Sequence, residues 1–483
     1  MSQPRVVVIV IGVMLSLFMA AVETTVVATA MPSIVSQLGG LGRYSWVFAA
    51  YMIASTTTTP LYGKLSDVYG RRSIFLAAMI VFLVGSILCA QSRSMNQLIG
   101  FRALQGLGAG GLMPLSFIII GDLFSFEQRA RMQGLFSGVW GVASIIGPLL
   151  GGFLVDQLNW RWVFYVNVIP GLVAGSLLWT TWREPSAHEK RINLPIDYAG
   201  ATLLTAGVVS LLLGLFQIES AGGLSLIGAS AALFAWLYSV ERKATDPVLP
   251  LSLFRGRLFT ISIIHGLLAG WAVFGSVSFV PLFVQLSLGK SATVAGSTLT
   301  PQMLSWVFAS IIGSRLLLHL NYRTIILAGM ASLTLGSFLM SILSSDTSLA
   351  GIMFNLSLMG IGMGLSIPAF MIAIQSTVAR EDLGTATATL QFSRIIGGAL
   401  GVSVMGLILS RKLAANLEAA GAAGLSVQDL TGPLHAGKMA ADEVLQNSFT
   451  GAMEYVFVAA FAAAAIGLAV VVFTPSVRLT RRR

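Results

Sequence analysis

Cysteine and histidine are scarce in this chain, and their scarcity excludes several classes of site. Cys89 is the only cysteine among 483 residues, so an internal disulfide framework and a site of several thiolates are both excluded. The four histidines are scattered without the spacing of metal ligands. The sequence also shows no Ser/His/Asp arrangement and no nucleotide-binding motif. We therefore expect no metal and no bound cofactor, and the sequence disfavours both an enzyme and an ATP-driven protein.

Charged residues are also few: they make up 10% of the chain, against 55% hydrophobic residues. The hydrophobic residues fall in repeated runs of roughly twenty, the length that spans a bilayer. The N-terminal run contains Glu23 and is longer than the core of a signal peptide, although Ala28–Ala30 resembles a cleavage site. The sequence therefore predicts an all-α polytopic membrane protein whose first helix is not cleaved.

Fourteen apolar runs are candidate membrane helices. They cover residues 6–34, 46–62, 73–91, 97–121, 133–156, 162–181, 196–217, 223–240, 257–286, 294–317, 323–343, 350–374, 386–410 and 452–474. Because an even number of spans returns the chain to its starting side, both termini are expected on the same side. One long loop, at about 411–450, is expected on the opposite side, and the sequence suggests no role for it.

The basic residues between the runs decide the orientation. The formal net charge of +10 comes from bases dispersed over many loops, so they form no phosphate-binding patch and we expect no nucleic-acid partner. Of the 29 Lys and Arg, 20 fall in alternate loops on one side, 7 on the other, and Arg102 and Arg394 inside apolar runs. Because short cytoplasmic loops collect Lys and Arg, both termini are predicted to be cytoplasmic, in the cell's inner (cytoplasmic) membrane.

An internal repeat divides the chain into two halves. Gly106–Gly110 with Pro114 recurs 254 residues later as Gly360–Gly364 with Pro368. The fourth run is thus echoed by the twelfth, as expected for two six-helix halves with two helices between them. We predict three parts: an N-terminal bundle at 1–182, linkers and two inserted helices at 183–257, and a C-terminal bundle at 258–483.

The ten residues Gly63–Arg72, between the second and third runs, combine one acid, three bases and two glycines. They are too few to fold alone, so we predict a tight cytoplasmic connection in which glycine permits a sharp turn. Asp67 is expected to pair with a base such as Arg129 or Arg131, and with the N-terminus of a helix from the second half. The alternative is a solvated charge cluster that sets only the topology.

The spacing of this stretch, G-x-x-x-D-x-x-G-R-R, resembles the loop between helices 2 and 3 of the major facilitator superfamily. The resemblance implies a transporter of two six-helix bundles, here with two inserted helices and fourteen helices in all. It also implies that the motif residues take part in conformational change: Gly63, Asp67, Gly70, Arg71 and Arg72.

The first run resembles a narrower branch of that family. Glu23–Pro32 is similar to the first-helix motif of fourteen-helix drug:proton antiporters, in which Asp is usual at the first position. Glu23 lies roughly 25 Å along the helix from Val6, well inside the bilayer. A carboxylate there is costly unless it is neutralised, and a group that binds a proton reversibly suits a proton carrier. The alternative is a structural glutamate satisfied by neighbouring hydroxyls.

Two further stretches resemble motifs of the same superfamily. Arg102–Gly111 is similar to the fourth-helix motif, whose arginine is implicated in proton transfer, and its glycines let a neighbouring helix come close. Trp160–Asn167 is similar to a signature of the fourteen-helix branch, and its aromatic residues also fit a membrane interface.

The fifth run resembles the motif that marks antiporters. Its Gly147, Pro148, Gly151 and Gly152 are expected to form a kink or a close helix interface that bends or slides. The alternative is simple packing of small residues.

Together these resemblances imply a proton-coupled antiporter that exports lipophilic small molecules by alternating access. The expected partners are a lipophilic small molecule, protons and the lipid bilayer; the proton gradient supplies the energy, and we expect a monomer. The proton-coupling candidates are Glu23, Asp67 and Arg102, and the substrate-cavity candidates are Glu23, Thr24, Gln105 and Arg394. The alternatives are a dedicated exporter of a lipid or metabolite and, more distantly, a channel or membrane sensor. The sequence leaves the substrate and its charge open.

Overall fold

The computed structural model describes residues 3–38, 44–182, 197–218, 220–244, 247–249, 251–290, 292–344, 347–421 and 439–476. Over these residues every regular element is a helix, as the apolar runs predicted. The expected linker Arg183–Pro195 and the basic residues from Arg478 onward lie outside the described residues.

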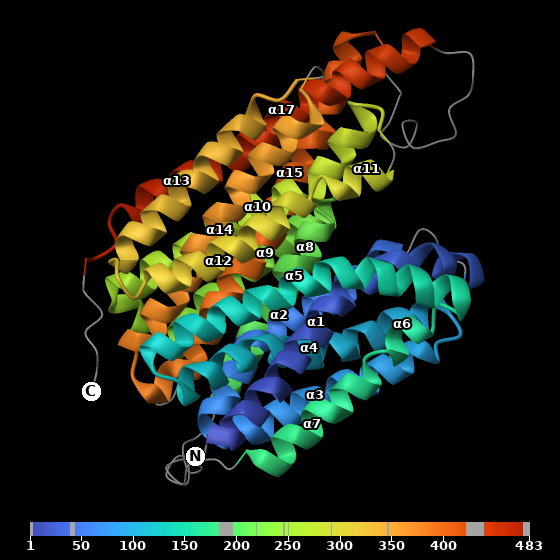
Figure 1. Cartoon of the computed structure of the whole chain (residues 1–483). Helices are drawn as coiled ribbons and strands as arrows, with labels where there is room; N and C mark the ends of the chain where they lie inside the picture. The colour runs from blue at the N-terminus through green and yellow to red at the C-terminus, as the bar shows by residue number, and fades with distance from the viewer. Residues whose placement is uncertain are drawn as a thin grey trace.

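The helices of the first half pack together in one group (Figure 1). They are α1 (Gln3–Leu38), α2 (Tyr44–Tyr69), α3 (Arg71–Ala90), α4 (Met95–Leu123), α5 (Phe126–Gln157), α6 (Trp162–Tyr165) and α7 (Val168–Thr181). The sixth predicted run is therefore two helices. Large apolar side chains such as Leu149 (70% exposed) and Ile169 (74%) lie on the outside, as expected for helices that face lipid.

A second group holds the helices of the C-terminal half. They are α10 (Arg257–Leu286), α11 (Ala292–Ser297), α12 (Thr300–Leu316), α13 (Tyr322–Ser341), α14 (Leu349–Thr377), α15 (Leu383–Ala419) and α17 (Met439–Val471). The 3-10 turns η3 (Leu253–Arg255) and η4 (Arg380–Asp382) precede α10 and α15. One apolar core runs through this group, from Ile261 to Val471.

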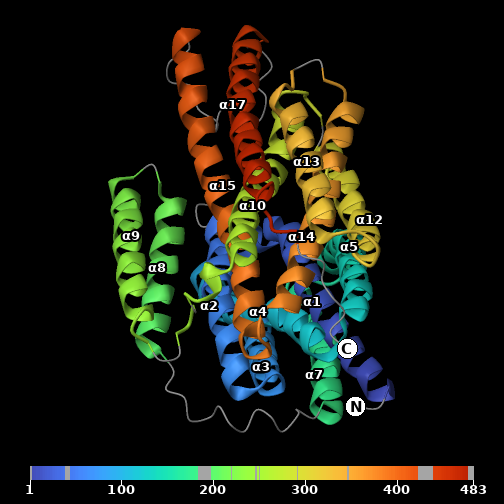
Figure 2. The same cartoon turned by 90° about the vertical axis from the view of Figure 1, so that its left-hand side faces the viewer.

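The inserted helices α8 (Tyr198–Phe216) and α9 (Ala221–Glu241) form a pair beside the two groups (Figure 2). α8 packs against α2 and α15, and thus touches both halves. α9 packs mainly on α8 and leaves large side chains such as Trp236 and Tyr238 exposed.

The glycines of the repeat let α4 lie close to its neighbours. A Cβ added at Gly106 or Gly110 would clash with the backbone of α2, and one at Gly108 with the backbone of α3. In the second half, Gly360 and Gly364 face α12 and Gly362 faces α13 in the same way. The backbone atoms that these glycines meet also correspond: Tyr51 and Gln302, Ser55 and Trp306, and Phe82 and Leu333 are each 251 residues apart. The repeat is therefore one of helix packing as well as of sequence.

The stretch Gly63–Arg72 is helical except at Gly70, so the predicted tight turn at a glycine is confirmed, whereas a longer loop is not present. α2 continues through Tyr69 and α3 begins at Arg71, which leaves Gly70 alone between them. Gly70 has φ 95°, a backbone conformation that suits glycine. Backbone groups at a membrane edge are best satisfied inside a helix, so the charged side chains did not require the helix to end.

The long outer loop was also placed wrongly. α15 continues to Ala419 and α17 begins at Met439, so much of 411–450 is helical, and residues 422–438 lie outside the described part of the chain. Alanine and other good helix formers continue a helix where the apolar run stops, because helix formation does not require hydrophobic side chains.

The count of fourteen membrane spans predicted from the sequence is not confirmed by helix length and hydropathy alone. Among the described residues, eleven helices are long and apolar enough to cross a membrane. α2, α5 and α12 are not among them. α12 has 17 residues, and α2 contains the polar run Ser55–Thr59, which lowers its hydropathy. α1 begins and α17 ends toward the same end of the bundle (Figure 1).

The close approach at Gly108 predicts a test of the packing. Gly108→Ala should destabilise the protein by roughly 1–3 kcal/mol, because the new methyl group must displace the backbone of α3. Gly100→Ala is the matched control on the same helix, since nothing lies within 4 Å of the added Cβ. The measurement is the midpoint of thermal unfolding in detergent. Equal midpoints for the two variants would contradict the assigned contact.

Candidate functional site

Asp67 joins the two halves at the N-terminus of α15. Its carboxylate accepts hydrogen bonds from the backbone N–H of Gly384 (3.1 Å) and of Thr385 (2.8 Å), and from the Thr385 hydroxyl (3.0 Å). Asp382, at the N-cap of α15, makes no capping bond with its side chain, so Asp67 of the other half caps this helix. A carboxylate there gains from both the free N–H groups and the helix dipole.

The expected helix N-terminus is therefore correct, but the expected base was wrong. Asp67 pairs with Arg71, with 2.5 Å between Nη1 and Oδ1. Arg71 opens α3 directly after the Gly70 turn, so its side chain reaches back to α2 over a short distance. Arg129 donates instead to backbone carbonyls, among them that of Gln375 in the second half (2.8 Å), and Arg131 is exposed.

An acid that the sequence analysis missed extends this contact. Asp122, at the end of α4, lies 3.1 Å from Arg71 Nε and 3.2 Å from Arg380 Nε of the second half. Acids and bases thus alternate from α2 to the second half. We call Asp67, Arg71, Asp122, Arg380 and Thr385 the Asp67 cluster. Removing one member of a buried pair leaves a charge uncompensated, which costs about 3–5 kcal/mol.

The other motif residues have distinct positions. A Cβ at Gly63 would clash with Ala388, so this glycine lets α2 and α15 approach. Arg72 points away from the Asp67 cluster: it donates to the Trp179 carbonyl (2.6 Å) and lies 4.8 Å from the centre of the Trp179 ring.

Close contacts between the halves continue from the Asp67 cluster along α5 and α12. The hydroxyl oxygens of Ser137 and Ser310 are 2.5 Å apart. A Cβ added at Gly141 would clash with the Val307 side chain. The two groups of helices converge at the end that holds the Asp67 cluster and separate toward the other (Figure 1).

Glu23 is buried in the first half and has a cationic partner. Its side chain is 0% exposed and pairs with Nη1 of Arg102. Asn167, between α6 and α7, donates to the second carboxylate oxygen. Thr24 does not contact the carboxylate: it is exposed, and its hydroxyl donates to the carbonyl of Ala21 in its own helix. The charge is therefore balanced by Arg102 rather than by neighbouring hydroxyls.

Arg102 is held by several groups besides Glu23. Its Nη1 donates to Gln105 Oε1 (2.7 Å), its Nε to the Val47 carbonyl (3.4 Å), and its guanidinium lies 4.2 Å from the centre of the Tyr51 ring. Gln105 in turn donates to Ser86 (3.1 Å). We call Glu23, Ser86, Arg102, Gln105 and Asn167 the Glu23 cluster.

Four helices meet in the Glu23 cluster. α1, α3 and α4 each provide side chains, and Asn167 joins them from the start of α7. Three of its members were predicted as site residues. Asn167 and Ser86 were not, although Asn167 ends the aromatic stretch that resembles a family signature, which is a signal for it.

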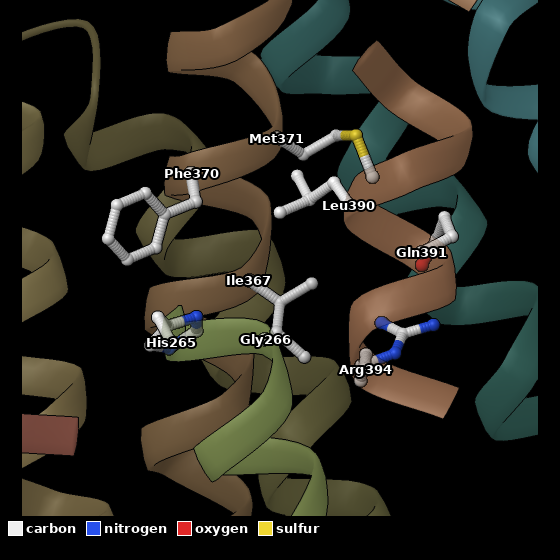
Figure 3. Close-up of a pocket in the computed structure, with 8 residues that line it drawn as sticks. All are labelled: His265, Gly266, Ile367, Phe370, Met371, Leu390, Gln391 and Arg394. Carbon is white, nitrogen blue, oxygen red and sulfur yellow. The ribbon is translucent and has the colours of Figure 1, made fainter. Parts of the chain in front are cut away.

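Arg394 lies apart from these residues, in α15 of the second half. It lines a very small pocket between α10, α14 and α15, together with His265 and Gln391 (Figure 3). His265 was missed by the sequence analysis, although an ionisable residue inside an apolar run is itself a signal of a functional site.

The antiporter-like motif on α5 is less informative. α5 is an unbroken helix over its whole length, and Gly147 and Gly151 are buried. A Cβ added at Gly152 would meet nothing within 4 Å, so no close interface forms at that glycine. The side chain of Pro148 lies outside the described part of the structure.

The sequence is similar to curated transporters over most of its length. The sequence model of the Major Facilitator Superfamily matches residues 13–402. The multidrug transporter protein MdtP of Bacillus subtilis (strain 168) is 38% identical over 422 residues, which cover 85% of this chain and 76% of that protein. Multidrug resistance protein 3 of the same organism is 37% identical over 409 residues, covering 83% and 79%.

Solved structures share the fold at low sequence identity. The human organic anion transporter MFSD10 (TETRAN) superposes with a TM-score of 0.66 at 17% identity, over 96% of this chain and 100% of that one. The proton:xylose symporter XylE has a TM-score of 0.65 at 12% identity, over 98% and 97%. These likenesses agree with the fold, and the family match over residues 13–402 together with the relatives at 37–38% identity shows that the chain belongs to the major facilitator superfamily.

Proposed function

We propose that this chain is a proton-coupled antiporter that exports lipophilic small molecules across the cytoplasmic membrane by alternating access, with both termini in the cytoplasm. Relatives named as multidrug and efflux transporters support the class of substrate. The observation that carries the proton coupling is the ion pair of Glu23 and Arg102, which is buried within membrane helices.

Glu23 suits proton exchange because its carboxylate can be neutralised in two ways inside the bilayer. In the structure Arg102 and Asn167 satisfy its two oxygens. A proton bound at either oxygen removes the charge and turns that oxygen into a donor. Arg102 then still has Gln105 and the carbonyl of Val47. Protonation therefore loosens α1 from α4 without leaving Arg102 unpartnered.

The Asp67 cluster is the proposed gate on the cytoplasmic side. It closes the end of the bundle to which the positive-inside rule assigns the cytoplasm. To open that end, Asp67 must leave the N-terminus of α15 and Asp122 must release Arg380, and water then replaces these partners. Substrate enters from the cytoplasm in that state. Protons reach Glu23 from the outside once the gate has closed again.

The role of Glu23 is tested by substitution in liposomes that contain an internal pH dye. Glu23→Gln should reduce substrate-induced proton movement to background, because an amide takes up no proton in this range. Glu23→Asp should retain part of it. Glu418→Gln, which removes an exposed acid on α15, is the control and should behave as the wild type. Full coupling in Glu23→Gln would place the proton site elsewhere.

The gate is tested by the reactivity of a cysteine at the contact between the halves. Asp67→Asn removes charge-assisted bonds worth about 2 kcal/mol. The fraction of molecules that are open at the cytoplasmic end should therefore rise roughly 30-fold. Ser137→Cys, in a Cys89→Ala background, reports opening through its reaction with a maleimide in inside-out vesicles. Asp156→Asn, at an exposed acid near the other end of α5, is the control. The proposed gate is wrong if Asp67→Asn, like the control Asp156→Asn, leaves the rate of the maleimide reaction unchanged.

A further inference from the structure

Three charged side chains meet where the inserted helices α8 and α9 lie against the end of α2. Glu241, the last residue of α9, is 4% exposed, and Lys64 of α2 is 5% exposed. A Cβ added at Gly200 in α8 would lie 2.9 Å from Glu241 Oε1 and 2.3 Å from Oδ2 of Asp197, the N-cap of α8. The positive charge of Lys64 acts on the Glu241 carboxylate. We call Lys64, Asp197 and Glu241 the Lys64 cluster.

The other contacts of the two acids lie within the inserted pair and the loop that follows it. Glu241 Oε1 accepts a hydrogen bond from the backbone N–H of Leu249 (3.2 Å), and Asp197 Oδ1 accepts one from that of Gly200 (2.7 Å). The second oxygen of each carboxylate is buried and makes no hydrogen bond in the described structure. A carboxylate buried in a membrane protein needs a cation nearby, and Lys64 supplies one. The acids of the inserted pair are thus tied to a base of the first half.

Apolar contacts continue this attachment along the length of α2. Leu61, one turn before Lys64 on the same helix face, packs in the apolar cluster that contains Val248 and the buried face of α8. Near the other end of α8, the ring centres of Phe216 and Trp46 are 6.5 Å apart. α8 therefore follows α2 from its first turn to its charged end.

The contact of the inserted pair with the second half is of a different kind. The side chains of α15 that pack on the pair are apolar, among them Phe392, Ile396 and Ala399. Among the described residues, α8 and α9 make no hydrogen bond or ion pair with α15. Apolar contact between membrane helices has no hydrophobic driving force, because lipid tails are equally apolar. Such helices can slide along each other, whereas a buried charge contact favours one arrangement.

We propose that the Lys64 cluster locks α8 and α9 onto the first half, so that the pair moves with α2 while α15 slides past α8. Lys64 precedes Asp67 of the proposed gate by three residues, so the lock and the gate share one end of α2. The inference goes beyond the proposed export function, because it assigns the inserted helices to one of the two halves. The movement of the halves belongs to that function, but the lock itself does not depend on it.

The lock is tested by pulsed electron resonance on pairs of spin labels in the purified full chain, in a Cys89→Ala background. Ser239→Cys on α9 and Thr180→Cys on α7 carry the labels at exposed positions of the inserted pair and of the first half. With the Lys64 cluster intact, this label pair should report one narrow distance.

Removing the charges of the two acids should release the pair. The double variant Asp197→Asn and Glu241→Gln keeps the shapes of both side chains, and asparagine still caps α8. It should replace the narrow distance with a broad distribution, because Lys64 loses both carboxylates. Lys243→Gln, at an exposed base two residues beyond Glu241, is the matched control and should keep the narrow distance. If the double variant does not fold, adding Lys64→Met removes the unpaired charge as well and should give the same broad distribution.

A third label shows which half the pair accompanies. His319→Cys lies at an exposed position of the second half, between α12 and α13. Asp67→Asn should lengthen the distance between the labels at Thr180 and His319, because it opens the proposed gate. The distance from Ser239 to Thr180 should stay constant, and the distance from Ser239 to His319 should change as the halves move.

Three results would overturn the lock. They are a broad distribution between Ser239 and Thr180 in the wild type, a narrow one that the double variant leaves unchanged, and a change in that distance while the distance from Ser239 to His319 stays constant. Failure of the proposed function is seen separately. If Asp67→Asn leaves the distance from Thr180 to His319 unchanged, the gate is wrong, and the double variant still decides the lock.

Discussion

A charge inside the hydrocarbon region needs a partner, and the arrangement of this protein depends on that constraint. Glu23 and Arg102 satisfy each other in the first half. Asp67, Arg71 and Asp122 do so at the end where the halves meet. Each pair joins different helices, so the charges that are costly to bury also fix how the helices pack.

The end of a helix provides the connection between the halves. The first N–H groups of α15 have no partners within the helix, and Asp67 of the first half accepts two of them. Such a contact is strong when water is excluded, yet water can replace it when the halves separate. This combination is what a gate requires, since it must hold one conformation without making the other inaccessible.

The two halves share a scaffold but not a chemistry. α4 and α14 approach their neighbours through glycines at corresponding positions. The positions that correspond to Arg102 and Gln105, 254 residues later, are Leu356 and Met359. The second half therefore has no copy of the Glu23 cluster at that place, and its polar pocket lies instead between α10, α14 and α15.

The sequence by itself determined the helical class, the repeat and the presence of a carboxylate and an arginine inside the membrane. The length of the apolar runs and the few charged residues within them can be identified from the order of the residues alone. It also indicated that Asp67 meets a helix end in the other half. Tertiary structure decided that Arg71 rather than Arg129 pairs with Asp67, and that Asp122, Asn167 and His265 join the sites. Those contacts depend on distances between helices far apart in the chain. The continuation of α2 through the charged motif was likewise decided by the tertiary structure. Because α2 packs against α15, Asp67 finds its partners there while it remains part of a helix.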